Sequence, residues 1–258
     1  MPSADSKTAA QTSTAALANP ARSKSAAPLP VSLVGMPAAE VVKRMVVMFV
    51  GFFCISMGVA LLTKSNTGTS AISVLPYTAY ELLHWPSYGT WVGLFNALLV
   101  LAQIALLRSR CQPVDIVIQL VFCVSFGAFV DISMWILGSY NPQVYPLRLL
   151  TLLAGVTMLA LGAYITLVSR VGVGAGDGFA RTVSQLTGID FGRSRIVCDS
   201  CWMLIAVALN IVFFQSLVTV REGTVATALF AGLFVNFFLR ILKPLEYAVL
   251  PENRPANS

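Results

Sequence analysis

The stretch that decides the fold of this chain is LLTLLAGVTMLALGAYITLVS, residues 149–169, because no Asp, Glu, Lys or Arg interrupts it. A helix needs roughly 20 mainly apolar residues to cross the hydrocarbon core of a bilayer. The chain has three further runs without charge and two with a single Asp each: Met45–Thr63, Gly89–Leu107 and Gly223–Leu239, then Ile116–Gly138 and Ile196–Val220. The sequence therefore predicts an all-α, polytopic membrane protein with about six transmembrane helices.

The composition agrees with a surface that is covered by lipid. Of the 258 residues, 57% are hydrophobic and 11% are charged, whereas an average soluble domain has about 25% charged residues. The formal net charge is +6. In a membrane protein such an excess belongs to cytoplasmic loops, where it sets the orientation. We therefore expect the lipid bilayer as a partner and no binding of nucleic acid.

The two ends of the chain differ from the rest. Residues 1–40 are rich in Ala, Ser, Thr and Pro and have no apolar run, which predicts a disordered tail. Residues 246–258 form a shorter polar tail. Between them we expect two membrane repeats, residues 41–140 and 145–245.

These repeats follow from matches at a spacing of about 104 residues. Glycine and polar positions carry the comparison, because Leu, Val and Phe match easily by chance. The matched positions are Gly51, Gly58, Ser65, Gly68, Ala71, Thr78 and Leu82 in the first half and Gly155, Gly162, Ser169, Gly172, Ala175, Thr182 and Leu186 in the second. Each half is expected to contain a long helix, a glycine-containing break, a short segment (69–83 or 176–187) and two more long helices.

The basic residues favour six spans, with both short segments re-entrant and both termini cytoplasmic. In that arrangement only Lys64, Arg148 and Arg221 lie outside. Ten lie inside: Lys43, Arg44, Arg108, Arg110, Arg170, Arg181, Arg193, Arg195, Arg240 and Lys243. Eight full spans would bring this distribution close to even, against the positive-inside rule. Three spans per half is an odd number, so the second half is predicted to be inverted, as in many secondary transporters.

The two breaks are the first candidates for a binding site. Gly68 and Thr69 lie in one break, and Gly174, Gly176 and Asp177 lie in the other. Glycine lets the backbone leave a helix and approach a ligand, and the first amides of the next short helix suit an anion. Plain loops with glycine for close helix packing are the alternative reading.

Polar residues inside the apolar runs are the second set of candidates. Asp131 and Asp199 align in the repeat with Asn236 and Asn96, so each half supplies one acid and one amide. Charged side chains at membrane depth are costly and mark pathways or proton relays. The alternatives are hydrogen bonds between helices and, for Asp199, a pair with Arg195 one turn earlier. Arg195 itself is read either as a positive-inside anchor or as a residue at the mouth of a cavity.

Several of these stretches resemble the YczE/YitT-like family of uncharacterised bacterial multi-pass membrane proteins. The resemblance rests on the break after the first helix of each half, on Gly172-Val-Gly-Ala-Gly-Asp177, on Gly192-Arg-Ser-Arg195 before Asp199, and on Glu222-Gly-Thr224. It covers about residues 43–245 and implies a location in the bacterial cytoplasmic membrane. It implies no established substrate or mechanism.

The function predicted from these features is a secondary transporter or facilitator of a small polar solute, with an anion preferred, and with Asp131 as the coupling residue. The alternative is a non-transporting accessory or scaffold protein that binds a protein partner or a second copy of itself. His84 is the single His and no metal-ligand or nucleophile–base set is visible. We therefore expect no enzyme activity, no metal and no cofactor.

Overall fold

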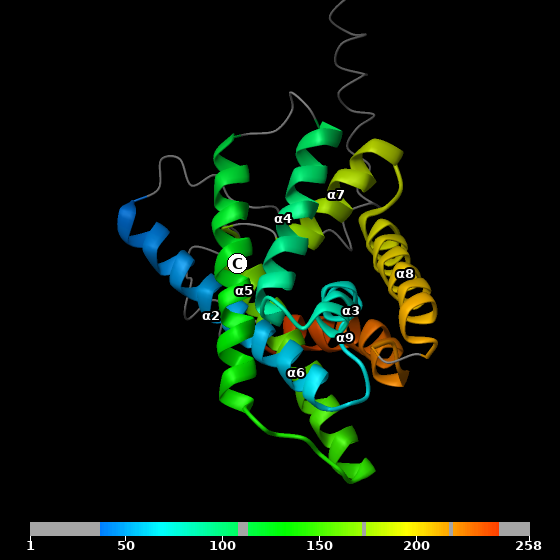
Figure 1. Cartoon of the computed structure of the whole chain (residues 1–258). Helices are drawn as coiled ribbons and strands as arrows, with labels where there is room; N and C mark the ends of the chain where they lie inside the picture. The colour runs from blue at the N-terminus through cyan, green and yellow to red at the C-terminus, as the bar shows by residue number, and fades with distance from the viewer. Residues whose placement is uncertain (1–36, 108–112, 172–173, 217–218, 243–258) are drawn as a thin grey trace, which may run out of the picture.

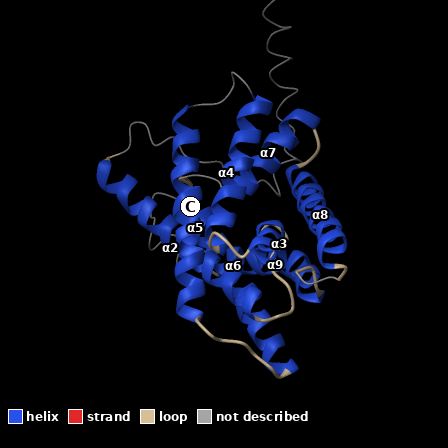
Figure 2. Ribbon diagram, in the orientation of Figure 1, coloured by secondary structure: helices blue, strands red, loops and turns tan. Residues whose placement is uncertain are grey.

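The computed structural model describes residues 37–107, 113–171, 174–216 and 219–242, and in these ranges it contains helices and loops only (Figures 1 and 2). The all-α prediction is confirmed for this part of the chain. The predicted tails lie almost wholly outside the described residues. The first helix, α2, begins at Ala38, inside the segment predicted as tail.

Eight α-helices and one π-helical turn follow one another in the described ranges, in an order that occurs twice. The order is long, short, long, long. The first half has α2 (Ala38–Lys64), α3 (Val74–Leu83), α4 (Tyr88–Leu107) and α5 (Pro113–Leu137); the second has α6 (Tyr145–Ser169), α7 (Ala175–Thr187), α8 (Phe191–Leu209) with its π-helical continuation η3 (Asn210–Phe214), and α9 (Glu222–Ile241).

Five of the described helices are long and apolar enough to cross a membrane. They are α2, α4, α6, residues 119–137 of α5, and the continuous helix 191–214. Large apolar side chains cover their outer faces, as at Leu94, Leu98 and Leu101 of α4, a surface that is stable in hydrocarbon and costly in water. The helices indicate an integral membrane protein. The sixth predicted span, α9, is a 20-residue helix, but several of its side chains lie outside the described residues, and it is not one of the five.

The two short helices cannot cross a bilayer. With 10 and 13 residues, α3 and α7 are about 15 and 20 Å long, against roughly 30 Å of hydrocarbon. Each ends in a left-handed C-cap, His84 after α3 and Gly188 after α7. In the first half the helix begins later than predicted, because residues 71–73 form a turn before Val74.

The first helices of the two halves, α2 and α6, pack against each other through glycine. A Cβ atom added at Gly51 would lie 3.0 Å from the Gly162 carbonyl oxygen, and one added at Gly58 would lie 2.8 Å from the Gly155 carbonyl oxygen. The residue numbers rise along one helix as they fall along the other, so the two helices run antiparallel. Small residues at such a crossing let two backbones come into direct contact, which is the usual device for helix association in lipid.

Apart from the contact of α4 with α5, which has no counterpart between α8 and α9 among the described contacts, the remaining contacts between helices fall into matched pairs. Helix α5 packs on α2 as α9 packs on α6, and α3 contacts α4 as α7 contacts α8. Across the halves, α3 contacts α8, and α7 contacts α4 (Figure 1). Exchanging the two halves leaves this set of neighbours unchanged, which agrees with the repeat read from the sequence.

Candidate functional site

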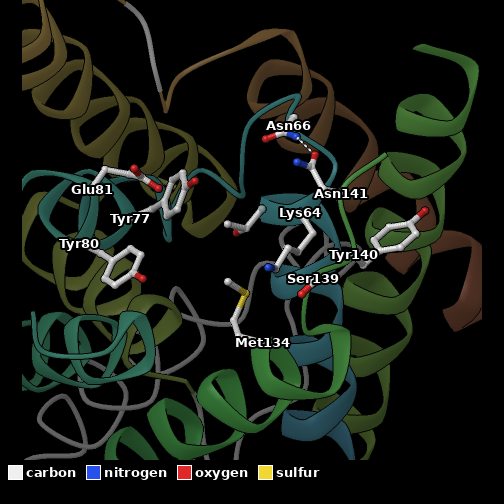
Figure 3. Close-up of a pocket in the computed structure, with 10 residues that line it drawn as sticks. Lys64, Asn66, Tyr77, Tyr80, Glu81, Met134, Ser139, Tyr140 and Asn141 are labelled. Carbon is white, nitrogen blue, oxygen red and sulfur yellow. Dashed lines mark hydrogen bonds between the residues drawn. The ribbon is translucent and has the colours of Figure 1, made fainter. Parts of the chain in front are cut away.

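A cavity opens where the first break meets the loop after α5. Its volume is 380 Å³, in the range of small-molecule sites. Side chains from the end of α2, from α3 and from the end of α5 with its following loop surround it (Figure 3). The lining residues are Thr63, Lys64, Asn66, Tyr77, Tyr80, Glu81, Met134, Ser139, Tyr140 and Asn141.

A second cavity of 180 Å³ adjoins the first at the break itself. The two share Thr63, Asn66, Tyr77 and Glu81, and the second adds Gly68 and Arg221. Gly68 has a φ of +119°, which favours glycine. The chain turns here and brings the break against the first turn of α9. The predicted site residue Gly68 therefore does line a polar cavity.

Taken together, the linings of the two cavities contain two cations, Lys64 and Arg221, and one carboxylate. Lys64 Nζ donates to the Gly138 carbonyl at 2.6 Å, and Arg221 Nη1 donates to the Asn66 carbonyl at 2.8 Å. These partners are neutral, and among the described residues neither cation forms an ion pair. Glu81 is the one carboxylate in the described lining. The local field therefore favours an anion.

Neutral hydrogen-bonding groups fill the gaps between these charges. Asn66 Nδ2 donates to Asn141 Oδ1 at 2.6 Å, which ties the break to the loop after α5 (Figure 3). Burial, together with the neighbouring Glu81 carboxylate, raises the pKa of the Tyr77 hydroxyl. Tyr77 therefore stays protonated and keeps a donor. Donors and acceptors that converge on a small volume are typical of a site for a polar solute.

A cluster of buried hydroxyl groups lies behind the cavity, and Thr63 belongs to both. Thr63 Oγ1 donates to Thr69 Oγ1 at 3.2 Å, and the Thr69 N–H donates to Thr224 Oγ1 at 3.3 Å. The Tyr88 hydroxyl faces those of Thr63, Thr69 and Ser73. The predicted site residue Thr69 is fully buried in this cluster.

The second break brings three of the predicted residues together. Arg195 forms ion pairs with Asp177 and with Asp199, the latter at 3.1 Å between Nε and Oδ2. The pairing of Asp199 with Arg195 on its own helix is thus present. Arg181, which has the i,i+4 spacing to pair with Asp177, instead lies over the ring of Phe191, 5.6 Å from its centroid.

The two breaks meet, and the place where they meet is apolar. A Cβ atom at Gly176 would overlap the side chain of Ile72. Around this contact, a core cluster of Phe95, Leu99, Val100, Cys123 and Ala175 is flanked by Ile72, Leu75, Phe179 and Trp202. Gly174 and Gly176 adjoin this apolar cluster, so the polar groups of the two breaks lie apart. The hydroxyl groups and the cavity belong to the first break. The Asp177–Arg195–Asp199 cluster belongs to the second.

The remaining predicted residues lie away from the cavity. Asp131 accepts hydrogen bonds from Ser87 Oγ at 2.5 Å and from the Gly89 N–H at 2.7 Å, so it binds the first turn of α4. Its role in coupling stays a prediction. Asn96 donates to the Val92 carbonyl of its own helix at 2.8 Å. The side chain of Asn236 lies outside the described residues.

Sequence reasoning did not single out Tyr77, Tyr80 or Asn141, although all three line the cavity. A signal was present for two of them. Tyr77, Tyr80 and Glu81 have the i, i+3, i+4 spacing that places side chains on one face of the short helix. Asn141 offered no comparable signal, because only the folded chain brings its loop against the first break.

Comparison with known proteins identifies the family and nothing beyond it. A family of unknown function, DUF6198, matches residues 42–240. No curated protein and no solved structure matches. The family name does not confirm the resemblance to the YczE/YitT-like family, which stays a prediction.

Proposed function

The chain belongs to the DUF6198 family of unknown function, and we propose that it is a secondary transporter or facilitator of a small polar solute, preferably an anion. The observation that carries this proposal is the polar cavity with Lys64 and Arg221 in its lining. A scaffold protein would need no such cavity at the point where a helix is interrupted.

The arrangement of the two halves supports a transporter. We propose six spans, with α9 as the sixth, and two inverted repeats that each have a re-entrant short helix. In support, α2 and α6 occupy the same place in the repeat and run antiparallel. If both cross the membrane, the halves have opposite orientations. Inverted halves exchange roles when a transporter opens to one side and then to the other.

The cavity supports the preference for an anion. Lys64 and Arg221 would attract the anionic group, while the Asn66 and Asn141 amides and the Tyr77 hydroxyl would orient the rest of the solute. Glu81 would exclude solutes with a second negative charge nearby or would bind an amine on the same solute. This assignment predicts small monoanions or zwitterions rather than cations.

The apolar contact between the breaks would act as the barrier. Ile72 lies against Gly176, and this contact would close the path between the cavity and the Asp177–Arg195–Asp199 cluster. We propose that the solute enters at the cavity and passes when α3 and α7 separate. The two polar regions would then be the outer and inner ends of one pathway, in the bacterial cytoplasmic membrane.

Uptake into proteoliposomes tests the proposal. Purified chain would be reconstituted and screened with radiolabelled carboxylates, inorganic phosphate, sulfate and amino acids. We expect uptake of at least one anionic or zwitterionic solute. Lys64→Gln and Arg221→Gln should raise its KM by about tenfold each, because each removes a charge-assisted hydrogen bond worth roughly 1.5 kcal/mol.

The matched control is Arg148→Gln. Arg148 donates to the Pro142 carbonyl at 2.9 Å and does not line the cavity, so its replacement should leave KM unchanged. Uptake that responds equally to all three substitutions would argue against the cavity as the binding site. Absence of uptake across the panel, with folded protein in the vesicles, would argue against transport.

A further inference from the structure

The cluster of hydroxyl groups behind the cavity has an unfilled hydrogen-bonding capacity. Tyr88 is 3% exposed. Its hydroxyl lies within reach of the hydroxyl groups of Thr63, Thr69 and Ser73, but it forms no hydrogen bond of good geometry with any described atom. Ser70 Oγ in the same break is also buried and has no partner among the described residues. Native proteins rarely leave such groups unpaired, so a bound species is expected at this point.

The Thr63 hydroxyl offers lone pairs to a bound species. Thr63 has one hydroxyl proton, and both the Val59 carbonyl at 2.9 Å and Thr69 Oγ1 at 3.2 Å are in reach of it. With that proton committed inside the protein, Thr63 Oγ1 offers only lone pairs to a new ligand. Thr63 also lies in the last turn of α2, where the helix dipole places partial negative charge. Both features favour a cation over an anion.

The ligand set favours a monovalent cation. The oxygens come from neutral hydroxyl groups, and divalent cations in proteins are usually bound through carboxylates. No group of three His, Cys, Asp or Glu side chains that could hold a metal ion occurs among the described residues. Two oxygens 3.2 Å apart can both contact one ion, and the buried side chains around them leave more room for a small ion than for a large one. This limited room favours Na⁺ over K⁺.

The neighbouring charges are compatible with a bound cation. The Lys64 ammonium group follows Thr63 in the chain, but it is held at the Gly138 carbonyl. The Tyr77 ring packs on the Tyr88 ring, with centroids 5.4 Å apart, and Tyr77 neighbours the Glu81 carboxylate. Glu81 therefore supplies a negative charge one ring away from the cluster.

We propose that Na⁺ binds between the hydroxyl oxygens of Thr63, Thr69, Ser73 and Tyr88, behind the solute cavity. Because Thr63 lines the cavity as well, the ion would hold the break in the shape that binds the solute. That second step rests on the proposed transport function. Binding of Na⁺ itself does not, and it is tested without solute.

The experiment is thermal unfolding of the purified full chain in detergent at constant ionic strength. NaCl is titrated against choline chloride and, separately, KCl against choline chloride. We expect Tm to rise by several degrees and to saturate with Na⁺, with a smaller rise with K⁺. The Na⁺ response should disappear in Tyr88→Phe and in Thr69→Val.

Two comparisons separate loss of binding from loss of folding. In choline alone, Tyr88→Phe should be at least as stable as the native chain, because it removes a buried hydroxyl that forms no hydrogen bond of good geometry with the described residues. Thr227→Val is the matched control for Thr69→Val, since Thr227 is equally buried but donates to the Gly223 carbonyl of its own helix at 2.7 Å. This variant should keep the full Na⁺ response.

The proposal is overturned if Tm is the same in Na⁺, K⁺ and choline, which would indicate a buried water. It is also overturned if Tyr88→Phe and Thr69→Val keep the Na⁺ response. A Na⁺ response in a protein that transports nothing would leave the ion site standing and remove the transport function. Solute uptake that does not depend on Na⁺ would rule out only the coupling between the bound ion and transport of the solute.

Discussion

At the scale of single residues, the acidic side chains of the helices are held by ion pairs and hydrogen bonds to neighbouring groups. The pair of Arg195 with Asp199 could be predicted, because an i,i+4 spacing on a helix fixes which side chains meet. The pair of Arg195 with Asp177 could not, because it depends on α7 packing against α8. The contacts of Asp131 could not be predicted either, because its partners lie at the start of another helix.

The contacts of Asp131 predict a structural effect of its replacement. In Asp131→Asn, one charged acceptor is lost from the Ser87 hydroxyl and the Gly89 N–H. We expect the free energy of unfolding to fall by about 1–2 kcal/mol, measured by thermal unfolding in detergent. Retained uptake per folded molecule would indicate that Asp131 serves only these contacts. Unchanged stability with complete loss of uptake would instead indicate the coupling role.

Asn210 is a buried residue on which three segments depend. Its Nδ2 donates to Thr219 Oγ1 at 2.7 Å and to Thr78 Oγ1 at 3.2 Å, and its Oδ1 accepts from the Thr219 N–H at 3.1 Å. Asn210→Ala would leave the buried Thr219 N–H without this acceptor. We expect a loss of about 2–3 kcal/mol in denaturant unfolding, against less than about 0.5 kcal/mol for the exposed control Gln143→Ala.

At the scale of elements, the uncharged runs locate the helices to within a few residues. The run that opens the second half, residues 149–169, lies inside α6 (Tyr145–Ser169) and ends at the same residue. The start of α2 at Ala38 was missed because residues 38–40 were assigned to the polar tail. Arg44 is buried: it binds Glu40 and donates to the Ser169 carbonyl at the end of α6.

The crossing of α2 and α6 predicts strong sensitivity to side-chain size. A Cβ atom at Gly58 would lie 2.6 Å from the Leu159 backbone nitrogen, so Gly58→Ala must push the helices apart. We expect a destabilisation of about 1–3 kcal/mol, seen as a lower Tm in detergent. The control is Gly174→Ala, since no atom of the described residues lies within 4 Å of a Cβ atom at Gly174. Equal Tm values for the two variants would contradict a direct contact between the two helix backbones.

At the scale of the whole molecule, the sequence predicts that the breaks converge but not what surrounds them. The repeat places each break after the first helix of its half, and the Ile72–Gly176 contact brings them together. The polar cavity was not predictable, because its walls come from residues 63–81, 134–141 and 221. These segments are neighbours only after α5 has packed on α2 and α9 has packed on α6.

The inverted arrangement makes a prediction about which loops face which side of the membrane. In a variant without native cysteines, Gln143→Cys lies in the loop between α5 and α6, and Gln185→Cys lies near the end of α7; both positions are exposed. Since only α6 would separate them across the bilayer, a membrane-impermeant maleimide should label Gln143→Cys in intact cells. It should label Gln185→Cys only after permeabilisation.

The control is Val124→Cys, which lies on the outer face of α5 at 75% exposure. In hydrocarbon its thiol cannot ionise, so neither condition should label it. Labelling of Gln143→Cys only from the inside would reverse the orientation and keep the inversion. Labelling of both positions from one side would contradict the inverted arrangement, because α6 would then not separate them across the bilayer. The cavity and the Asp177–Arg195–Asp199 cluster could not, in that case, be the two ends of one pathway.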